Sequence, residues 1–367
     1  MLAAMEAVRA RALLGRTPGL NTTQLQALIA EAGEEPVRLS RARSGGAADL
    51  PPAARAFLSR PDEAAIDSDV DWLEGSGARI LLYTDADYPP LLRESPSPPA
   101  VLYVLGSLEA LHSPQLAMVG SRSPTPAGRA SAREFAAWFA RVGITVTSGL
   151  AFGIDASSHE GALAGGGLTV AVLGSGLDRI YPAEHTALAT RIAHSGALVS
   201  EFPPRTAPLP TNFPRRNRII AGLSLGTLVV EAARKSGSLI TAKQALDAGR
   251  EVFAIPGSIH SSVSRGCHQL IKSGAKLVEE AADVLTELKI SFPKEELTAS
   301  PDATADSPAL DNEYEMLLDA VGFEGATIDT LVARTGLPSQ SVASMLLILE
   351  LGGRVSALPG GRYARIP

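Results

Sequence analysis

The feature that most constrains the fold is a series of short apolar runs separated by stretches of helix length. Most of these runs are rich in Val, Ile, Leu or Thr and end in Gly, Ser or Pro, and they occupy residues 116–119, 144–147, 168–173, 197–199, 227–230, 251–255 and 276–278. Such runs, alternating with amphipathic stretches, are typical of βαβ units, in which helices cover both faces of a mostly parallel sheet. The sequence therefore predicts an α/β fold from about residue 115 to residue 288.

Small residues dominate the positions that directly follow these runs. Three examples are Gly120-Ser121-Arg122, Ser148-Gly149-Leu150 and Gly174-Ser175-Gly176. In open parallel α/β sheets, ligands bind beyond the carboxyl ends of the strands. Small residues let backbone N–H groups approach a ligand closely, and helix N-termini favour anions. We therefore expect this edge of the sheet to bind phosphate or phosphodiester groups.

Common phosphate-binding and hydrolase motifs do not fit the sequence. No Gly-Lys dipeptide is present, so a P-loop is excluded, and Arg179 stands where a dinucleotide fingerprint needs its third glycine. Ser224 lies in a G-x-S-x-G pattern, but a helix precedes it and a strand follows, the reverse of a nucleophile elbow. The six histidines show no metal spacing, and for His159 a satisfied position on a capped helix is favoured over a role in the site. We expect no metal and no cofactor.

The strongest local charge lies in residues 205–250. This stretch has eight basic residues against two acidic ones, a charge of +6, within a chain whose net charge is −6. Its basic residues are Arg205, Arg215, Arg216, Arg218, Arg234, Lys235, Lys243 and Arg250. A guanidinium group grips phosphate, and the nearby ring of Phe213 can stack on any base. Basic residues at a helix start oppose the macrodipole unless an anion binds there. The stretch predicts a site for single-stranded nucleic acid; the alternative is a solvated helix start with Phe213 in the core.

Six blocks of the sequence resemble the DprA (Smf, DNA-processing protein A) family. In chain order they are VGSR at 119–122, TSGLAFGID at 147–155, NFPRRNRIIAGL at 212–223, KSGSLITA at 235–242, GREVFAIPG at 249–257 and LIKSGA at 270–275. The resemblance extends over residues 80–285. It implies an extended Rossmann-like domain that binds single-stranded DNA and forms a homodimer. An N-terminal helical, SAM-like domain flanks this core, and many members carry a C-terminal winged helix.

The resemblance also implies a function. A protein of this family receives single strands during natural transformation, protects them and loads the RecA recombinase for homologous recombination, displacing single-strand-binding protein. It is a mediator and not an enzyme. The domains implied for this chain are residues 1–79 (helical), 80–288 (DNA-binding), 289–311 (acidic linker) and 312–367 (winged helix).

The resemblance assigns several residues by position. The pocket arginine of the family falls on Arg122, its aromatic residue on Phe213 and the basic residue before S-G-S-L-I-T on Lys235. Together with the loop and charge arguments, the expected DNA-binding set is Gly120, Ser121, Arg122, Ser148, Gly149, Gly174, Ser175, Gly176, Phe213, Arg215, Arg216, Asn217, Arg218, Lys235 and Lys243. Two positions depart from the family pattern. Pro210 stands where some relatives carry a lysine, so that a phosphate contact is missing or supplied by Arg205 or Arg215, and His268 stands where asparagine is common.

The N-terminal segment is expected to be helical. Its turn at 18–21 loosely resembles a helix–hairpin–helix turn, although a small helical packing domain is the favoured interpretation, and residues 38–48 are expected to form a loop. Apolar residues predict short strands at 80–83 and 101–105. Five prolines between these strands predict an extended connecting segment.

The C-terminal segment has the pattern of a winged helix. Helices are expected at 312–321, 328–334 and 339–351, followed by a hairpin of residues 354–356 and 362–365. No Lys or Arg lies between Pro338 and Gly353, so the third helix is not expected to read a DNA groove. A protein-interaction or dimer-supporting role fits this segment better.

Composition bounds the remaining possibilities. The single cysteine excludes an internal disulfide. Charges near the N-terminus rule out a signal peptide, and no apolar stretch is long enough to span a membrane, so the expected location is the cytoplasm. Residues 279–329 hold 14 acidic and 2 basic residues, so the net charge of −6 averages an acidic segment with a basic one. Two alternatives stay open: an enzyme acting on a nucleotide or other phosphorylated small molecule, and a winged-helix transcription factor, which the base-free third helix argues against.

Overall fold

The computed structural model describes residues 2–32, 49–291, 312–323 and 325–366. The loop expected at residues 38–48 and most of the expected linker lie outside the described residues. Among the described helices, none is long and apolar enough to cross a membrane.

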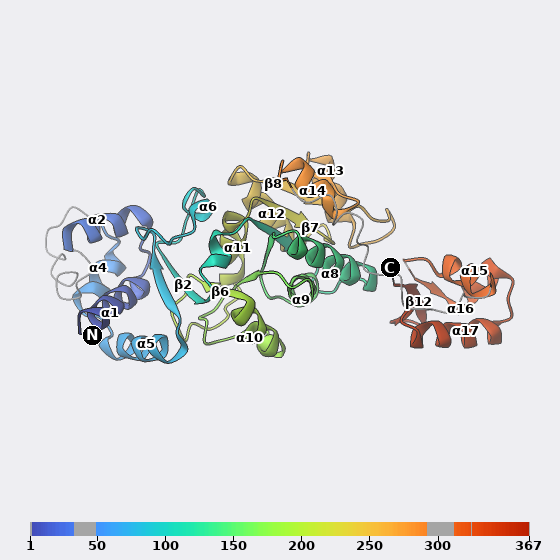
Figure 1. Ribbon diagram of the computed structural model, residues 1–367, viewed down its shortest axis with the longest axis horizontal. Helices are drawn as coiled ribbons and strands as arrows, with labels where there is room; N and C mark the ends of the chain where they lie inside the picture. Colours follow the sequence, from blue (N-terminus) through green and yellow to red (C-terminus); the bar gives the residue numbers. More distant parts are fainter. Residues whose placement is uncertain (1, 33–48, 292–311, 324, 367) are drawn as a thin grey trace.

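A nine-stranded sheet forms the centre of the molecule (Figure 1), in the order β1-β2-β6-β5-β4-β3-β7-β8-β9. The strands are β1 (Arg79–Leu82), β2 (Val101–Gly106), β3 (Gln115–Val119), β4 (Thr145–Ser148), β5 (Thr169–Val172), β6 (Gly196–Ser200), β7 (Gly226–Val229), β8 (Glu251–Ala254) and β9 (Lys276–Leu277). From β6 to β9 all neighbours are parallel, whereas β2 pairs antiparallel with both β1 and β6. The α/β fold with a mostly parallel sheet is confirmed, and each predicted run nearly coincides with a strand.

Helices cover both faces of this sheet. They are α7 (Glu109–His112), α8 (Pro126–Arg141), α9 (Ile154–Ala164), a 3-10 turn η1 (Ala183–His185), α10 (Thr186–Ser195), α11 (Asn212–Leu223), α12 (Ser238–Asp247), α13 (Arg265–Lys272) and α14 (Ala281–Glu287). Alternate residues of β3 show the two layers: Ala117 and Val119 pack with α11, α12 and α13, whereas Leu116 and Met118 pack with α8, α9 and α14. Burial on both faces explains why the strands read as continuous apolar runs.

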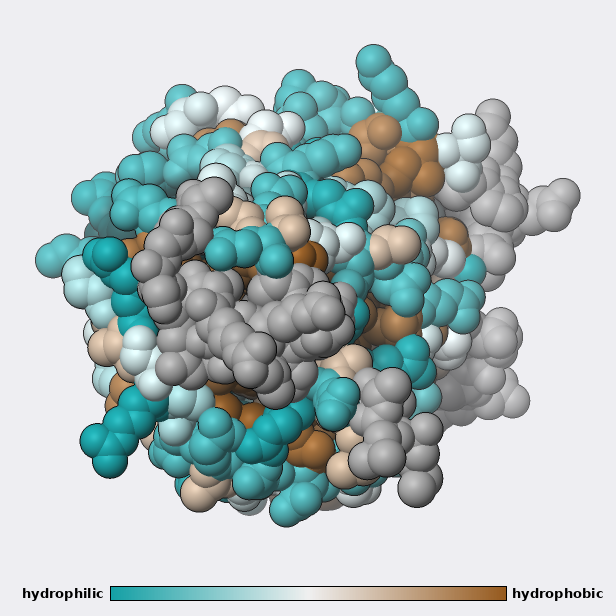
Figure 2. All heavy atoms as spheres, turned by 90° about the vertical axis from the view of Figure 1, so that its left-hand side faces the viewer, coloured by the Kyte–Doolittle hydropathy of each residue, from teal (hydrophilic) through white to brown (hydrophobic). Residues whose placement is uncertain are grey.

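The N-terminal helices α1 (Leu2–Arg16), α2 (Thr22–Ala32), α4 (Pro52–Ser59) and α5 (Glu63–Ser76) share a core with one end of the sheet. Between α1 and α2, the Asn21 side chain accepts a hydrogen bond from the Gln24 N–H (2.9 Å), and the Gln24 side chain accepts one from the Asn21 N–H (3.1 Å). This turn therefore satisfies its own amides, which favours the packing interpretation of the segment. The surface over these helices is mostly hydrophilic, with small scattered apolar spots (Figure 2).

One expectation about the segment before β2 was wrong. Residues 90–93 are not extended but form the short helix α6 (Pro90–Arg93). Pro90 occupies the first helical turn, where its missing N–H costs nothing and its fixed φ suits a helix. The prolines start a helix here rather than preventing one.

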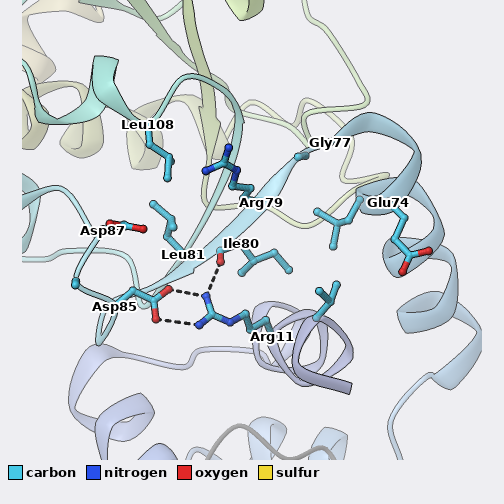
Figure 3. Close-up of a pocket in the computed structure, with 13 residues that line it drawn as sticks. Arg11, Glu74, Gly77, Arg79, Ile80, Leu81, Asp85, Asp87 and Leu108 are labelled. Atoms are coloured by element: carbon cyan, nitrogen blue, oxygen red, sulfur yellow. Dashed lines mark hydrogen bonds and ion pairs between the residues drawn. The ribbon is translucent and has the colours of Figure 1, made fainter. Parts of the chain in front are cut away.

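Strand β1 lies at the edge of the sheet, where residues of β1, α1 and α5 line a cavity of about 670 Å³ (Figure 3). The Arg11 guanidinium spans this cavity. It donates hydrogen bonds to the carbonyl of Ile80 (2.8 Å) and to both carboxylate oxygens of Asp85 (2.6 and 3.1 Å). A side chain from α1 thus donates a hydrogen bond to a backbone carbonyl on the open edge of the sheet.

The C-terminal residues form a winged helix with a core of its own. It contains α15 (Asn312–Val321), α16 (Ile328–Thr335), α17 (Ser339–Leu351), β11 (Val355–Leu358) and β12 (Arg362–Arg365), close to their predicted bounds. A further strand, β10 (Ala326–Thr327), pairs with β12 and was not predicted, since two residues carry no readable period.

Candidate nucleic-acid interface

The largest group of predicted site residues meets where the order of the strands reverses. After β3 the chain adds β4, β5 and β6 on one side, and it then returns to add β7, β8 and β9 on the other. The point between β3 and β7 is where open α/β sheets bind ligands. A cavity of about 640 Å³ opens there, and we call it the switch-point pocket. Its lining includes Gly120, Ser121, Arg122, Asp155, Tyr181, Phe213, Arg216, Asn217, Lys235, Ser236, Ser238 and Thr241.

Glycine at position 120 lets the loop after β3 pass through a narrow gap. A Cβ atom there would lie 2.6 Å from the Cγ1 atom of Ile154 and 2.9 Å from the carbonyl oxygen of Glu231. The Glu231 carboxylate then accepts hydrogen bonds from the N–H (2.9 Å) and the hydroxyl (2.6 Å) of Thr125, which caps α8. The loop that carries Arg122 is therefore fixed at both ends, while Arg122 itself is exposed at the rim.

Aromatic rings and a guanidinium group lie together in this pocket. The rings of Phe213 and Tyr181 have centroids 5.6 Å apart, and the Arg122 guanidinium carbon lies 5.7 Å from the Phe213 centroid. Gly174 makes room for the ring, because a Cβ atom there would lie 2.9 Å from Phe213 Cδ1. Phe213 is half-buried and Tyr181 is 49% exposed. Flat apolar faces beside a free cation suit the stacking of unpaired bases.

Arg216 is a buried structural cation. Its side chain donates hydrogen bonds to the carbonyl of Gly149 (2.6 Å) and to the carbonyl of Val172, so that it joins the ends of β4 and β5. Gly149 is required opposite it, because a Cβ atom would lie 2.5 Å from the guanidinium nitrogen. Burial lowers the pKa of Arg216 to about 10, against the opposing effect of Asp155, so the group stays protonated at neutral pH.

Asp155 is the carboxylate that faces Arg216. It accepts hydrogen bonds from the N–H groups of Gly149 (3.2 Å) and Ala151 (3.3 Å), which holds the loop after β4 in place. Burial raises its pKa, and the positive charge of Arg216 opposes this rise. Its Oδ2 atom is thus engaged with the loop that shapes the pocket.

Arg215 and Arg218 are directed to Glu201 and do not line the switch-point pocket. Both guanidinium groups pair with the same carboxylate oxygen of Glu201, whose side chain is only 3% exposed. Arg215 also lies 5.2 Å over the ring of Phe202, and its side chain is 59% exposed. The arginines of the R-R-N-R motif therefore have different environments: Arg216 is buried, whereas Arg215 and Arg218 flank Glu201.

Two further cations of the basic stretch have acidic neighbours from distant parts of the sequence. Arg205 lies 3.9 Å from Asp69, and Arg250 lies 3.8 Å from Glu94. Lys243 is exposed on α12 outside the pocket lining. Lys235, in contrast, lines the pocket, and within the described residues it has no acidic partner.

The remaining predicted residues form walls rather than the pocket surface. The hydroxyls of Ser148 and Ser175 donate to the carbonyls of Met118 (2.6 Å) and Arg179 (2.6 Å), and both side chains are buried. Gly176 donates its N–H to the carbonyl of Thr206 (3.0 Å). These positions shape the loops behind Phe213.

His159 lies inside the protein, but the favoured interpretation of a satisfied histidine on a capped helix holds only in part: its buried Nε2 atom has no hydrogen-bond partner among the described residues, and α9 has no side-chain cap there. It is fully buried, its Nδ1 atom lies 2.7 Å from the hydroxyl oxygen of Thr169, and burial lowers its pKa to about 3. It is therefore neutral at physiological pH and does not line the switch-point pocket.

Sequence reasoning missed Tyr181 and the serines of the 236–238 turn. Tyr181 precedes Pro182 in a long loop after β5, and no strand pattern places it beside Phe213. The sequence did offer one signal for Tyr181: it is an aromatic residue in a loop at the carboxyl ends of the strands. Ser236 directly follows Lys235, Ser238 is the first residue of α12, and Ser236 Oγ lies 2.7 Å from Ser238 Oγ.

Comparison with known proteins places this geometry in a family. A family model described as DNA recombination-mediator protein A matches residues 79–289, and a model described as DprA winged helix domain matches residues 301–361. The chain belongs to the DprA family. Protein Smf of Escherichia coli (strain K12), a relative in the same family, is 46% identical over 317 residues, which cover 85% of this chain and 84% of that protein. The DNA processing protein DprA of Streptococcus pneumoniae is 45% identical over 205 residues, 56% of this chain and 72% of that protein.

Solved DprA structures share the fold. DprA from Streptococcus pneumoniae superimposes with a TM-score of 0.64 at 35% identity, covering 76% of this chain and 96% of that one. DprA from Helicobacter pylori, described for its single-stranded DNA binding mode, gives a TM-score of 0.53 at 27% identity over 59% of this chain and 97% of that one. The extended Rossmann-like core and the C-terminal winged helix are therefore those of DprA proteins.

Proposed function

We propose that the protein binds single-stranded DNA in the switch-point pocket, protects it and loads RecA onto it in natural transformation and homologous recombination. The observation that carries the proposal is the arrangement of two unpaired cations around aromatic rings. Among the described residues Arg122 and Lys235 line the pocket without forming an ion pair, and Phe213 and Tyr181 share that lining. Cations can take phosphates while the rings take bases.

Two helix N-termini strengthen the attraction for an anion. α11 begins at Asn212 and α12 at Ser238, neither has an acidic residue in its first turn, and neither N-cap side chain makes a capping hydrogen bond. Residues at the start of both helices line the pocket. The positive ends of the two helix dipoles and the basic side chains nearby together favour bound phosphate.

The same contacts favour a single strand over a duplex. Stacking on Phe213 needs a base whose face is free, and bases inside a duplex are already stacked on each other. Each base–aromatic stack contributes about 1–3 kcal/mol. We therefore expect a clear preference for single strands that does not depend on sequence.

The enzyme alternative lacks a catalytic pair. Asp155 is the carboxylate of the pocket lining, which contains neither His, Cys nor Glu in the described part of the chain. It already accepts two backbone hydrogen bonds and faces Arg216. A general base acts together with a second catalytic group, and among the described residues of this lining neither His, Cys nor Glu accompanies Asp155, so binding without catalysis is the better account.

The partners follow from family membership and from exposed apolar residues. We propose a cytoplasmic homodimer that meets RecA and single-strand-binding protein, with the domain boundaries given by the sequence. Leu246 and Leu277 are 56% and 47% exposed near the β8–β9 end of the sheet. On α17, Leu347 and Leu351 are 57% and 82% exposed, and that helix has no Lys or Arg. The winged helix therefore suits contact with protein better than with a DNA groove.

The test is a binding titration with oligo-dT and a matched duplex. Wild type should bind oligo-dT far more tightly, with a salt slope of about −0.7 per phosphate neutralised. Phe213→Ala should weaken oligo-dT binding about tenfold or more through the lost stacking, and Arg122→Ala should also reduce the salt slope. Arg60→Ala, an exposed arginine on the N-terminal helices, is the matched control. Equal affinity for duplex and single strand, or nucleotide hydrolysis without oligo-dT binding, would contradict the proposal.

A further inference from the structure

A second basic cavity lies next to the switch-point pocket. It has a volume of about 570 Å³ and is lined by Arg234, Ile259, Arg265, His268, Gln269, Lys272 and Ser273. We call it the α13 pocket. Its lining contains no acidic residue, and within the described part of the chain Arg234, Arg265 and Lys272 form no ion pair. Three exposed cations around one cavity create a positive potential that favours an anion from outside the chain.

The basic residues of α13 form one stripe. Arg265, His268, Gln269 and Lys272 follow the spacing i, i+3, i+4, i+7 of a single helix face, and they span about 10 Å. The opposite face is buried through Gly266 and Cys267. Since Arg265 is the first residue of the helix, its charge opposes the macrodipole, whereas Lys272 at the last turn is favoured by it. A basic side chain at position 265 is stabilised when an anion occupies the cavity.

Tight packing fixes this stripe beside the loop after β7. The Gly266 N–H donates to the carbonyl of Ala232 (2.7 Å), and the Ala232 N–H donates to the carbonyl of Val263 (2.6 Å). A Cβ atom on Gly266 would lie 2.6 Å from that Ala232 oxygen. Arg234 follows two residues later, so its backbone is held close to α13.

One loop separates the two cavities. Ala233, Lys235 and Ser236 line the switch-point pocket, whereas Arg234 between them lines the α13 pocket. A polymer bound at Lys235 therefore needs to cross only this loop to reach Arg234 and Arg265. Ile259, 72% exposed at the α13 pocket, adds an apolar surface for a sugar or base.

We propose that the α13 pocket is a second phosphate-binding site that takes the next nucleotides of a single strand held in the switch-point pocket. The inference rests on the proposed function, because it extends the same strand. In this proposal Arg234 and Arg265 contact phosphate groups of the bound strand. The strand follows a path from Phe213 across the 233–236 loop to α13.

The experiment measures oligo-dT affinity as a function of length, from about 4 to about 24 nucleotides. The test variant is Arg234→Ala/Arg265→Ala. The control is Arg55→Ala/Arg60→Ala, which removes the same charge from exposed positions on the N-terminal helices. For long oligonucleotides, the test variant should lose about tenfold in affinity and about 1.4 in salt slope, as expected for two phosphate contacts. For the shortest oligonucleotides it should match wild type.

Each other outcome has a defined meaning. Equal losses at every length, or a loss no larger than that of the control, would overturn the second site. A loss confined to duplex DNA would make the α13 pocket a duplex contact and would also overturn it. If wild type binds no length of oligo-dT, the proposed function itself fails, which is distinguishable because the inference predicts normal binding of short strands.

Discussion

Replacing Arg216 separates a structural arginine from the DNA-contacting residues around it. In Arg216→Met, the carbonyls of Gly149 and Val172 lose a buried donor, and Asp155 loses the charge that faces it. Removing one member of a buried charge pair costs about 3–5 kcal/mol. The loss of the two hydrogen bonds, at about 1–3 kcal/mol each, gives a similar magnitude. We expect the free energy of unfolding to fall by about 3–5 kcal/mol at pH 7.

The loss should depend on pH with a definite sign. Burial raises the pKa of Asp155 in the folded state, and without Arg216 the rise is larger. Between the unfolded and folded pKa values the folded state binds more protons, so the free energy of unfolding falls as the pH increases through this window. The destabilisation should thus be smallest below the ordinary carboxyl pKa and should grow towards neutral pH. Asp155→Asn in the same chain should remove this dependence.

The assay is urea unfolding followed by tryptophan fluorescence. The two tryptophans, Trp72 and Trp138, lie on α5 and α8, so the signal reports on the core and not on the winged helix. Arg122→Met is the comparison, since Arg122 is exposed and should lose oligo-dT affinity at an unchanged unfolding midpoint. If Arg216→Met keeps its midpoint and loses oligo-dT affinity, Arg216 contacts DNA and the structural reasoning is refuted.

Two further changes test the loop after β3 and the C-terminal unit. Gly120→Ala places a Cβ atom against Ile154 and the Glu231 carbonyl. We therefore expect the free energy of unfolding, measured with urea, to fall by about 1–3 kcal/mol and oligo-dT binding to weaken. Unchanged values would show that the gap around residue 120 is not tight. Removing residues 291–367 should leave the tryptophan-detected unfolding of the core within about 0.5 kcal/mol, because the winged helix packs its own core. A larger shift would reveal a supporting contact.

The sheet was predictable because its residues obey a local rule. Strands buried on both faces read as apolar runs, and small residues follow where the chain leaves the sheet. The carboxyl ends of parallel strands meet at one edge, which brings Gly120 and Lys235 to the same side of the sheet, whereas the strand order and its switch point came only from the structure. The α6 helix escaped because proline disfavours helix interiors but favours the first turn, and composition alone does not distinguish the two.

The sequence could not predict which basic residues of the basic stretch form ion pairs. Residues 205–250 carry a local charge of +6, yet acids outside the stretch lie beside four of its arginines. Glu201 takes two of them, and Asp69 and Glu94 take one each. Such partners are set by tertiary packing, so local charge marked the right region but not which cations are free. The same reason hid Tyr181, whose place beside Phe213 depends on the path of a long loop.

The Arg11 contact at β1 also limits how copies of this protein can assemble. Of the two ends of the sheet, one has its Ile80 carbonyl occupied by Arg11, while the other ends in the exposed two-residue strand β9. On the same edge the N–H and C=O of Leu82 are bonded to Asp85, so few backbone groups remain to pair with another strand. Pairing of copies through sheet edges is therefore available from one side only, and such pairing closes after two molecules instead of propagating into a fibre.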